Sequence, residues 1–115
     1  MTSEVYSIPE GRIVIAHSDK DISIGYLVLN PGKELPKHNR PVLEELRQIS
    51  GRCVMKLYED DGIREVTLHE DEKLEIPPRQ YHVHSNPFLD LSYTLWIAHG
   101  DITAIIESIR KNKKM

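Results

Sequence analysis

Three histidines, one arginine and one glutamate have the types and spacing that could support chemistry. His38 and Arg40 are two residues apart, His82 and His84 are also two apart, and Glu44 follows in the first segment. Side chains two residues apart on a strand point the same way, so each pair is expected on one face. Two histidines and a carboxylate can hold a divalent metal, whereas an arginine binds carboxylate or phosphate groups. The same five residues therefore support either a metal site or an anion site.

The segments 32–51 and 77–86 also match two longer patterns. The first, G-x5-H-x-H-x3-4-E-x6-G, is matched at Gly32, His38, Glu44 and Gly51. The second, G-x5-P-x-G-x2-H-x3-N, is matched at Pro77, His82 and Asn86. Together they resemble the two motifs of the cupin superfamily over roughly residues 22–99. The resemblance implies an all-β fold, the cupin double-stranded β-helix or jelly-roll-like barrel.

The chain departs from these motifs at three positions. Arg40 stands where the first motif has its second histidine, and Asp71 and Arg79 stand where the second motif has glycines. In cupins with the full pattern, two histidines and the glutamate of the first motif and the histidine of the second hold a divalent metal. One of those four ligands is therefore missing here.

The resemblance leaves His38, Glu44 and His82 as metal ligands, and the spacing to the following glycine favours Glu44 over Glu45. Iron(II), manganese, zinc or nickel would suit such a site. His84 is a candidate replacement ligand. The fixed positive charge of Arg40 opposes a divalent ion, and Arg40 could instead pair with Glu44 without any metal.

Three functions remain open from the sequence. In the first, a metal-dependent enzyme acts on a small anionic or carbohydrate-like molecule, with Arg40 orienting the substrate and His84 moving a proton. The second is a metal-free binding or sensor module, and the third is a metal-independent sugar isomerase or epimerase. The expected ligand-binding residues are Arg40, Gln48, Arg79 and His84. In the metal-free module, Arg40, His38, His82 and Arg79 would clamp the anion.

The rest of the chain indicates one small domain over residues 1–115, with a barrel at about 12–99. Short apolar strands alternate with turns such as Asp61-Gly62. A helix is expected at about 101–111, capped by Asp101, with C-terminal lysines in its last turn. Its isoleucines lie three and four residues apart in one stripe. We expect this stripe to pack on the outside of the barrel or against a partner chain, which favours a homodimer.

Composition excludes several classes of protein. The chain has 115 residues, 39% of them hydrophobic, and a net charge of −3. No basic face indicates nucleic-acid binding, and the longest apolar run, at residues 13–16, is far too short to cross a membrane. The single cysteine, Cys53, excludes an internal disulfide and falls in an apolar strand pattern. We expect a buried, inert thiol in a cytoplasmic protein.

Overall fold

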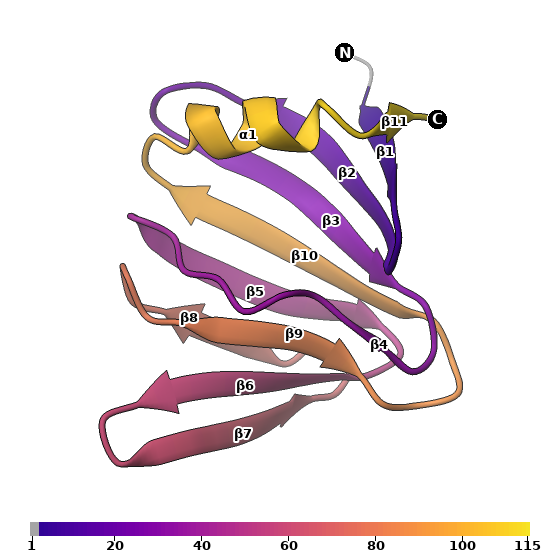
Figure 1. The fold of residues 1–115 in the computed structure, drawn as a ribbon, viewed down its shortest axis with the longest axis vertical. Coiled ribbons are helices and arrows are strands. Elements are labelled where there is room, and N and C mark those ends of the chain that lie inside the picture. The colour runs from indigo at the N-terminus through magenta and orange to yellow at the C-terminus, as the bar shows by residue number, and fades with distance from the viewer. Residues whose placement is uncertain (1–2) are drawn as a thin grey trace.

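The computed structural model describes residues 3–115 and contains two antiparallel sheets (Figure 1). The larger sheet has seven strands in the order β11-β1-β2-β3-β10-β5-β8, and the smaller has four in the order β4-β9-β6-β7. Their bounds are Glu4–Ile8 (β1), Gly11–Ser18 (β2), Ser23–Leu29 (β3), Lys33–Glu34 (β4), Leu43–Ser50 (β5), Cys53–Glu59 (β6), Gly62–Leu68 (β7), Lys73–Ile76 (β8), His82–Asn86 (β9), Ser92–His99 (β10) and Lys113–Lys114 (β11). One helix, α1, spans Thr103–Ile109. The predicted all-β fold with a short C-terminal helix is confirmed.

Alternating burial along the strands defines the core between the two sheets. In β10, Ser92, Thr94, Trp96 and Ala98 point inward and are buried, while the residues between them are more exposed. Apolar side chains from both sheets meet them in one continuous cluster. Cys53 lies in this cluster with no exposed surface, and burial raises the pKa of its thiol to about 11. The expected buried thiol is therefore present, and it stays protonated at neutral pH.

Two of the motif departures fall where the backbone requires the left-handed conformation. Asp71 has φ of 70° and Arg79 has φ of 68°. Glycine adopts these angles without steric conflict, whereas a side chain adds strain. The chain has therefore kept the two turns of the cupin pattern after losing both glycines.

The two ends of the chain differ from the sequence-based expectation. The larger sheet begins at Glu4 rather than near residue 12, and α1 ends at Ile109 rather than at about 111. The lysines expected in the last helical turn lie beyond it. Lys113 and Lys114 instead form β11, which pairs with Ser7 and Tyr6 of β1. The chain ends in a strand because this segment pairs with the distant β1. The local sequence signals that predict helix ends carry no information about that pairing.

The isoleucine stripe of α1 faces its own protomer. Ile106 has no exposed surface, and Ile102 is 5% exposed; both belong to the core cluster. Ile105 and Ile109 are half-buried and pack against it. Figure 1 shows α1 lying across the strands of the larger sheet. The stripe therefore supplies no free dimer surface, and a homodimer stays a prediction without this support.

No helix within residues 3–115 is long and apolar enough to cross a membrane.

Candidate functional site

Three histidines converge from two neighbouring segments of the smaller sheet. His82 and His84 lie on β9, and His38 forms an isolated antiparallel bridge with His82, its amide donating to the His82 carbonyl at 3.1 Å. This bridge brings the His38 ring within 4.4 Å of the His82 ring, centroid to centroid, and within 5.5 Å of the His84 ring. One potential ligand atom from each histidine lies within 4.8 Å of the others. The alternation predicted for β9 therefore holds, because both histidines reach the same cluster.

Backbone carbonyls fix which nitrogen of two rings carries the proton. His38 Nδ1 lies 2.9 Å from the Pro36 carbonyl, and His82 Nδ1 lies 2.9 Å from the Gln80 carbonyl. A carbonyl oxygen can only accept, so each Nδ1 is the donor. The Nε2 atom of each ring then keeps its lone pair for a ligand. This outer contact is the arrangement that orients metal-binding histidines in other proteins.

Glu44 lies beside this cluster without a hydrogen-bond donor. Its Oε1 atom is 3.8 Å from His82 Nε2. Glu44 Oε1, His82 Nε2 and His84 Nδ1 are buried and have no hydrogen-bond partner in residues 3–115. The neighbouring Glu45 instead pairs with His99 at 2.6 Å on the exposed side of β5. Glu44 is thus the acidic residue of the site.

Burial keeps the histidines neutral and makes the carboxylate harder to ionise. Burial, with Arg40 nearby, lowers the pKa of His38 to about 4. The pKa of His82 is lowered by burial, and that of His84 is held well below its ordinary value by burial and by the other two histidines. Burial raises the pKa of Glu44, and Arg40 partly opposes that effect. The three histidines therefore stay neutral at neutral pH and keep lone pairs for a ligand.

Arg40 does not satisfy Glu44 by direct contact. Its Nη1 donates to the Asn39 carbonyl at 3.2 Å, and it forms no ion pair with any carboxylate of the described chain. The guanidinium is half-buried and faces the same pocket as His38, Glu44 and His84. In this structure, therefore, Arg40 does not take the place of a metal by pairing directly with Glu44. Arg40 is thus a cation at the pocket that interacts with Glu44 at a distance but forms no direct ion pair within residues 3–115.

Two of the expected ligand-binding side chains lie elsewhere. Gln48 has no exposed surface; its Oε1 accepts from Thr94 at 2.7 Å and its Nε2 donates to Ser92 at 3.0 Å. It contributes to the core between β5 and β10. Arg79 is exposed in the turn just before β9, and its backbone amide donates to the Arg40 carbonyl at 2.7 Å. Arg79 therefore supports the Arg40 segment through its backbone.

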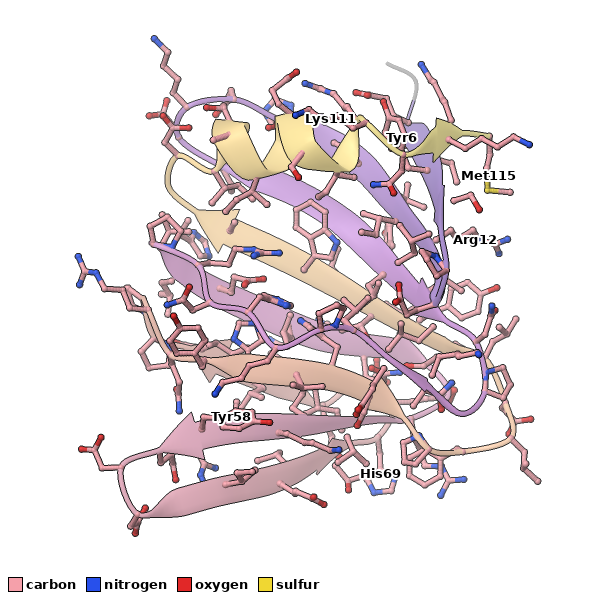
Figure 2. All side chains as sticks on the ribbon, viewed as in Figure 1. Tyr6, Arg12, Tyr58, His69, Lys111 and Met115 are labelled. Carbon is pink, nitrogen blue, oxygen red and sulfur yellow. The ribbon has the colours of Figure 1, made fainter. Side chains whose placement is uncertain are left out.

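The remaining histidines, His17, His69 and His99, lie outside the cluster. His17 contacts Asp19 at 2.7 Å, and His99 contacts Glu45. Figure 2 shows His69 at the end of the molecule formed by β6 and β7, far from α1. His69 is exposed, which makes it a suitable control position for the histidines of the cluster.

The pocket beside the histidines has an apolar wall that sequence reasoning missed. The pocket is small, with a cavity volume of about 50 Å³, and it opens to solvent. Its polar end is formed by His38, Arg40, Glu44 and His84. Seven apolar residues complete the lining: Ile13, Leu27, Leu35, Trp96, Ile102, Ile105 and Ile109. The isoleucine stripe was visible in the sequence, but nothing local indicated that it would face this pocket.

Comparisons with known proteins agree with this architecture. No protein-family model matches the chain. The chain is 30% identical over 79 residues to a 3-hydroxyanthranilate 3,4-dioxygenase from Jannaschia sp. (strain CCS1). That match covers 69% of this chain and 43% of the relative, so the chain spans less than half the length of the curated relative it matches.

Solved structures match a larger share of this chain. Oxalate decarboxylase from Bacillus subtilis, crystallised at pH 4.6, superposes with a TM-score of 0.77 at 23% identity, covering 85% of this chain and 28% of the other. A second structure of that enzyme, with a TM-score of 0.76, concerns its Mn(II) centres. A conserved protein of unknown function from Streptococcus pyogenes matches with a TM-score of 0.66 at 15% identity, covering 76% and 72% of the two chains. With seven motif positions in place and two facing sheets that superpose on these structures, the chain has the double-stranded β-helix fold of the cupins, as its sequence predicts.

Proposed function

We propose that this chain is a divalent-metal-dependent enzyme that acts on a small anionic molecule. His38, His82, His84 and Glu44 would hold the metal, and Arg40 would bind the anionic group of the substrate. His84 would take the place of the histidine that Arg40 replaces in the first motif. The proposal is supported by the relatives, since the names of both enzymes denote chemistry on small carboxylates and one has Mn(II) centres.

One observation carries the metal proposal: several acceptor atoms converge with no donor between them. His82 Nε2 and Glu44 Oε1 both present lone pairs across 3.8 Å, and both lack a partner in the described chain. Buried polar atoms left in this way cost about 1 to 3 kcal/mol each, and a shared cation removes that cost.

The spacing is compatible with one ion. Metal–nitrogen and metal–oxygen bonds are about 2.1 Å long, so two ligand atoms of one ion lie at most about 4.2 Å apart. The 3.8 Å pair of His82 and Glu44 meets this limit, and the ligand atoms of the three histidines lie within 4.8 Å of one another, about 0.6 Å beyond it, so small side-chain shifts would complete the site.

Besides binding the metal, residues of this chain would orient the substrate and exclude water from it. A bound divalent metal would supply Lewis-acid polarisation of a substrate oxygen. Hydrogen bonds from His38 and His82 to backbone carbonyls hold their rings in register for binding. Arg40 can bind a carboxylate through two parallel N–H donors and orient it toward the histidines. The apolar side chains around the pocket exclude water from the bound molecule.

Metal analysis of the purified protein, before and after incubation with iron(II), manganese, zinc and nickel, tests the proposal. We expect close to one metal per chain and a rise in melting temperature when the metal is added, because binding to the folded state stabilises it. His82→Ala and His84→Ala should each weaken metal affinity by at least about tenfold. His69→Ala, at an exposed histidine, should not change it.

The result for His84 separates this arrangement from other metal sites. If metal binds and His84→Ala binds it as tightly as the parent protein, His84 is not a ligand. If no metal binds under any condition, the metal-dependent enzyme is excluded. The metal-free binding module would then be the function to test, starting with carboxylates as ligands of Arg40.

A further inference from the structure

The pocket is divided into a charged end and an apolar end, and this division bears on the substrate. Arg40 and the histidines occupy one side. Ile13, Leu27 and Trp96 line the pocket from β2, β3 and β10 of the larger sheet, and Ile105 and Ile109 line it from α1. Figure 1 shows why one helix can do this: α1 lies across β2 and β3, above the space between the sheets.

The apolar end would bind a hydroxylated molecule poorly. A sugar or sugar acid carries hydroxyl groups on every side, and each needs a hydrogen-bond partner when water is removed. The isoleucine, leucine and tryptophan carbons of this wall offer none. An apolar body instead gains free energy on the same surface, in proportion to the area it removes from water.

The wall is continuous with the packed core, since Leu27, Trp96 and Ile102 belong to the core cluster, but the isoleucines of α1 contribute to it differently. Ile106 points into the core and has no exposed surface. Ile105 and Ile109, on the neighbouring face of the same helix, are only half-buried. Both line the pocket, so a ligand there can cover part of their remaining apolar surface.

From this division, and relying on the proposed function for the role of Arg40, we propose that the substrate is a small monocarboxylate with an apolar body. The carboxylate binds Arg40 beside the histidine cluster, and the body packs between Trp96 and the isoleucines of α1. This substrate class narrows the small anionic molecule and excludes the carbohydrate-like ligand that the sequence left open.

Binding measurements with three carboxylates test the proposal: benzoate, D-glucuronate and acetate. Benzoate and glucuronate each carry one carboxylate on a six-membered ring, but only glucuronate has hydroxyl groups. Acetate reports on the anion site alone. Each is titrated by calorimetry into the full chain, both metal-free and loaded with zinc. We expect benzoate to bind at least about tenfold more tightly than glucuronate.

Variants assign the two ends of the ligand. Ile105→Ser should weaken benzoate several-fold and leave acetate unchanged, and Ile105→Trp should block benzoate by filling the apolar end. Ile63→Ser, at an exposed apolar residue of β7, is the matched control and should change neither. Arg40→Gln should weaken all three anions while the protein still takes up zinc.

The outcomes separate this inference from the metal proposal. Two results overturn the apolar-body inference even if metal is bound. In one, glucuronate binds as tightly as benzoate; in the other, both Ile105 variants bind benzoate as tightly as the parent protein. Binding of benzoate that depends on Ile105 and Arg40, in a protein that never takes up metal, supports the inference and overturns the metal-dependent enzyme. Failure of all three anions to bind overturns the inference.

Discussion

At the histidine cluster, burial and hydrogen bonding act on the same property, the charge of the imidazoles. The Nδ1 atoms of His38 and His82 each donate to a backbone carbonyl, which a neutral ring can do while keeping Nε2 unprotonated. Burial then disfavours the second proton, since a charged imidazole would lose its hydration. Arg40 adds a positive charge nearby and lowers the pKa of His38 further. The cluster is therefore suited to bind a cation other than a proton.

The metal-free protein should lose stability as the pH falls from about 6.5 toward 5. The pKa of His38 is about 4 in the folded protein, below its ordinary value of 6.5, so the unfolded chain binds the proton first. The stabilising effect of the neutral ring is thus complete above pH 6.5 and declines below it. Each histidine of this kind contributes a slope of about 1.4 kcal/mol per pH unit. The raised pKa of Glu44 acts in the opposite direction and reduces the net slope.

Urea unfolding of metal-stripped protein at pH 7.5, 6.5, 5.8 and 5.0 measures this slope. His38→Gln should flatten it, whereas His69→Gln should leave it unchanged because that side chain is exposed. A free energy of unfolding that stays constant from pH 6.5 to 5.0 would contradict the assignment of neutral, buried histidines.

Among the elements, the turn before β9 has the most direct effect on the site. Arg79 has φ of 68°, its amide donates to the Arg40 carbonyl at 2.7 Å, and its carbonyl accepts from Asn39 Nδ2 at 3.2 Å. Both contacts use the backbone of Arg79. The turn therefore holds the segment that carries His38 and Arg40, and the side chain of residue 79 is not needed for this.

Arg79→Gly should stabilise the protein by about 0.5 to 1 kcal/mol. A side chain in the left-handed region costs about 1 to 2 kcal/mol, and the extra freedom of glycine in the unfolded chain offsets part of the gain. Arg79→Ala, which keeps the strain, is the control and should not stabilise. Equilibrium unfolding of both variants measures the difference. A glycine variant less stable than the alanine variant would show that the Arg79 side chain makes a stabilising contact.

Sequence periodicity was sufficient for the elements whose pattern is local. The alternation of β9 placed His82 and His84 on one side, and motif spacing selected Glu44 over Glu45. Gln48 shares a face of β5 with Glu44, but it lies four residues further along the strand, where its side chain hydrogen-bonds to Thr94 and Ser92 of β10. Parity predicts the face on which a side chain lies. It does not predict how far along the strand the side chain sits, because that depends on pairing with the neighbouring strand.

Elements held in place by distant partners could not be predicted. β11 has two residues, and its place follows from pairing with β1, more than a hundred positions earlier in the chain. The same ends are joined by Arg110, which donates to both carboxylate oxygens of Glu4 at 3.0 Å. Neither contact leaves a periodic signal in the sequence. Local helix signals alone therefore predict that the C-terminal lysines belong to the helix.

At the scale of the whole molecule, α1 joins the core to the pocket. Its Ile106 side chain fills space between the sheets, while Ile105 and Ile109 line the pocket. The Glu4–Arg110 ion pair and the β1–β11 pairing fix the chain just beyond the helix. Since the helix is anchored on its core side, its pocket side can change with little effect on the fold. The apolar wall of the pocket is thus the part of this molecule most free to vary with the ligand.

Substitution of the two neighbouring isoleucines tests this division of the helix. Ile106→Ala should lower the free energy of unfolding by about 2 to 5 kcal/mol, because it opens a cavity at a fully buried position. Ile105→Ala removes the same atoms from a half-buried position, where water replaces them, and should lower it by less than about 1.5 kcal/mol. Benzoate affinity should show the reverse order, falling for Ile105→Ala and holding for the folded fraction of Ile106→Ala. If both variants lose stability equally, Ile105 belongs to the core and α1 has no separate pocket face.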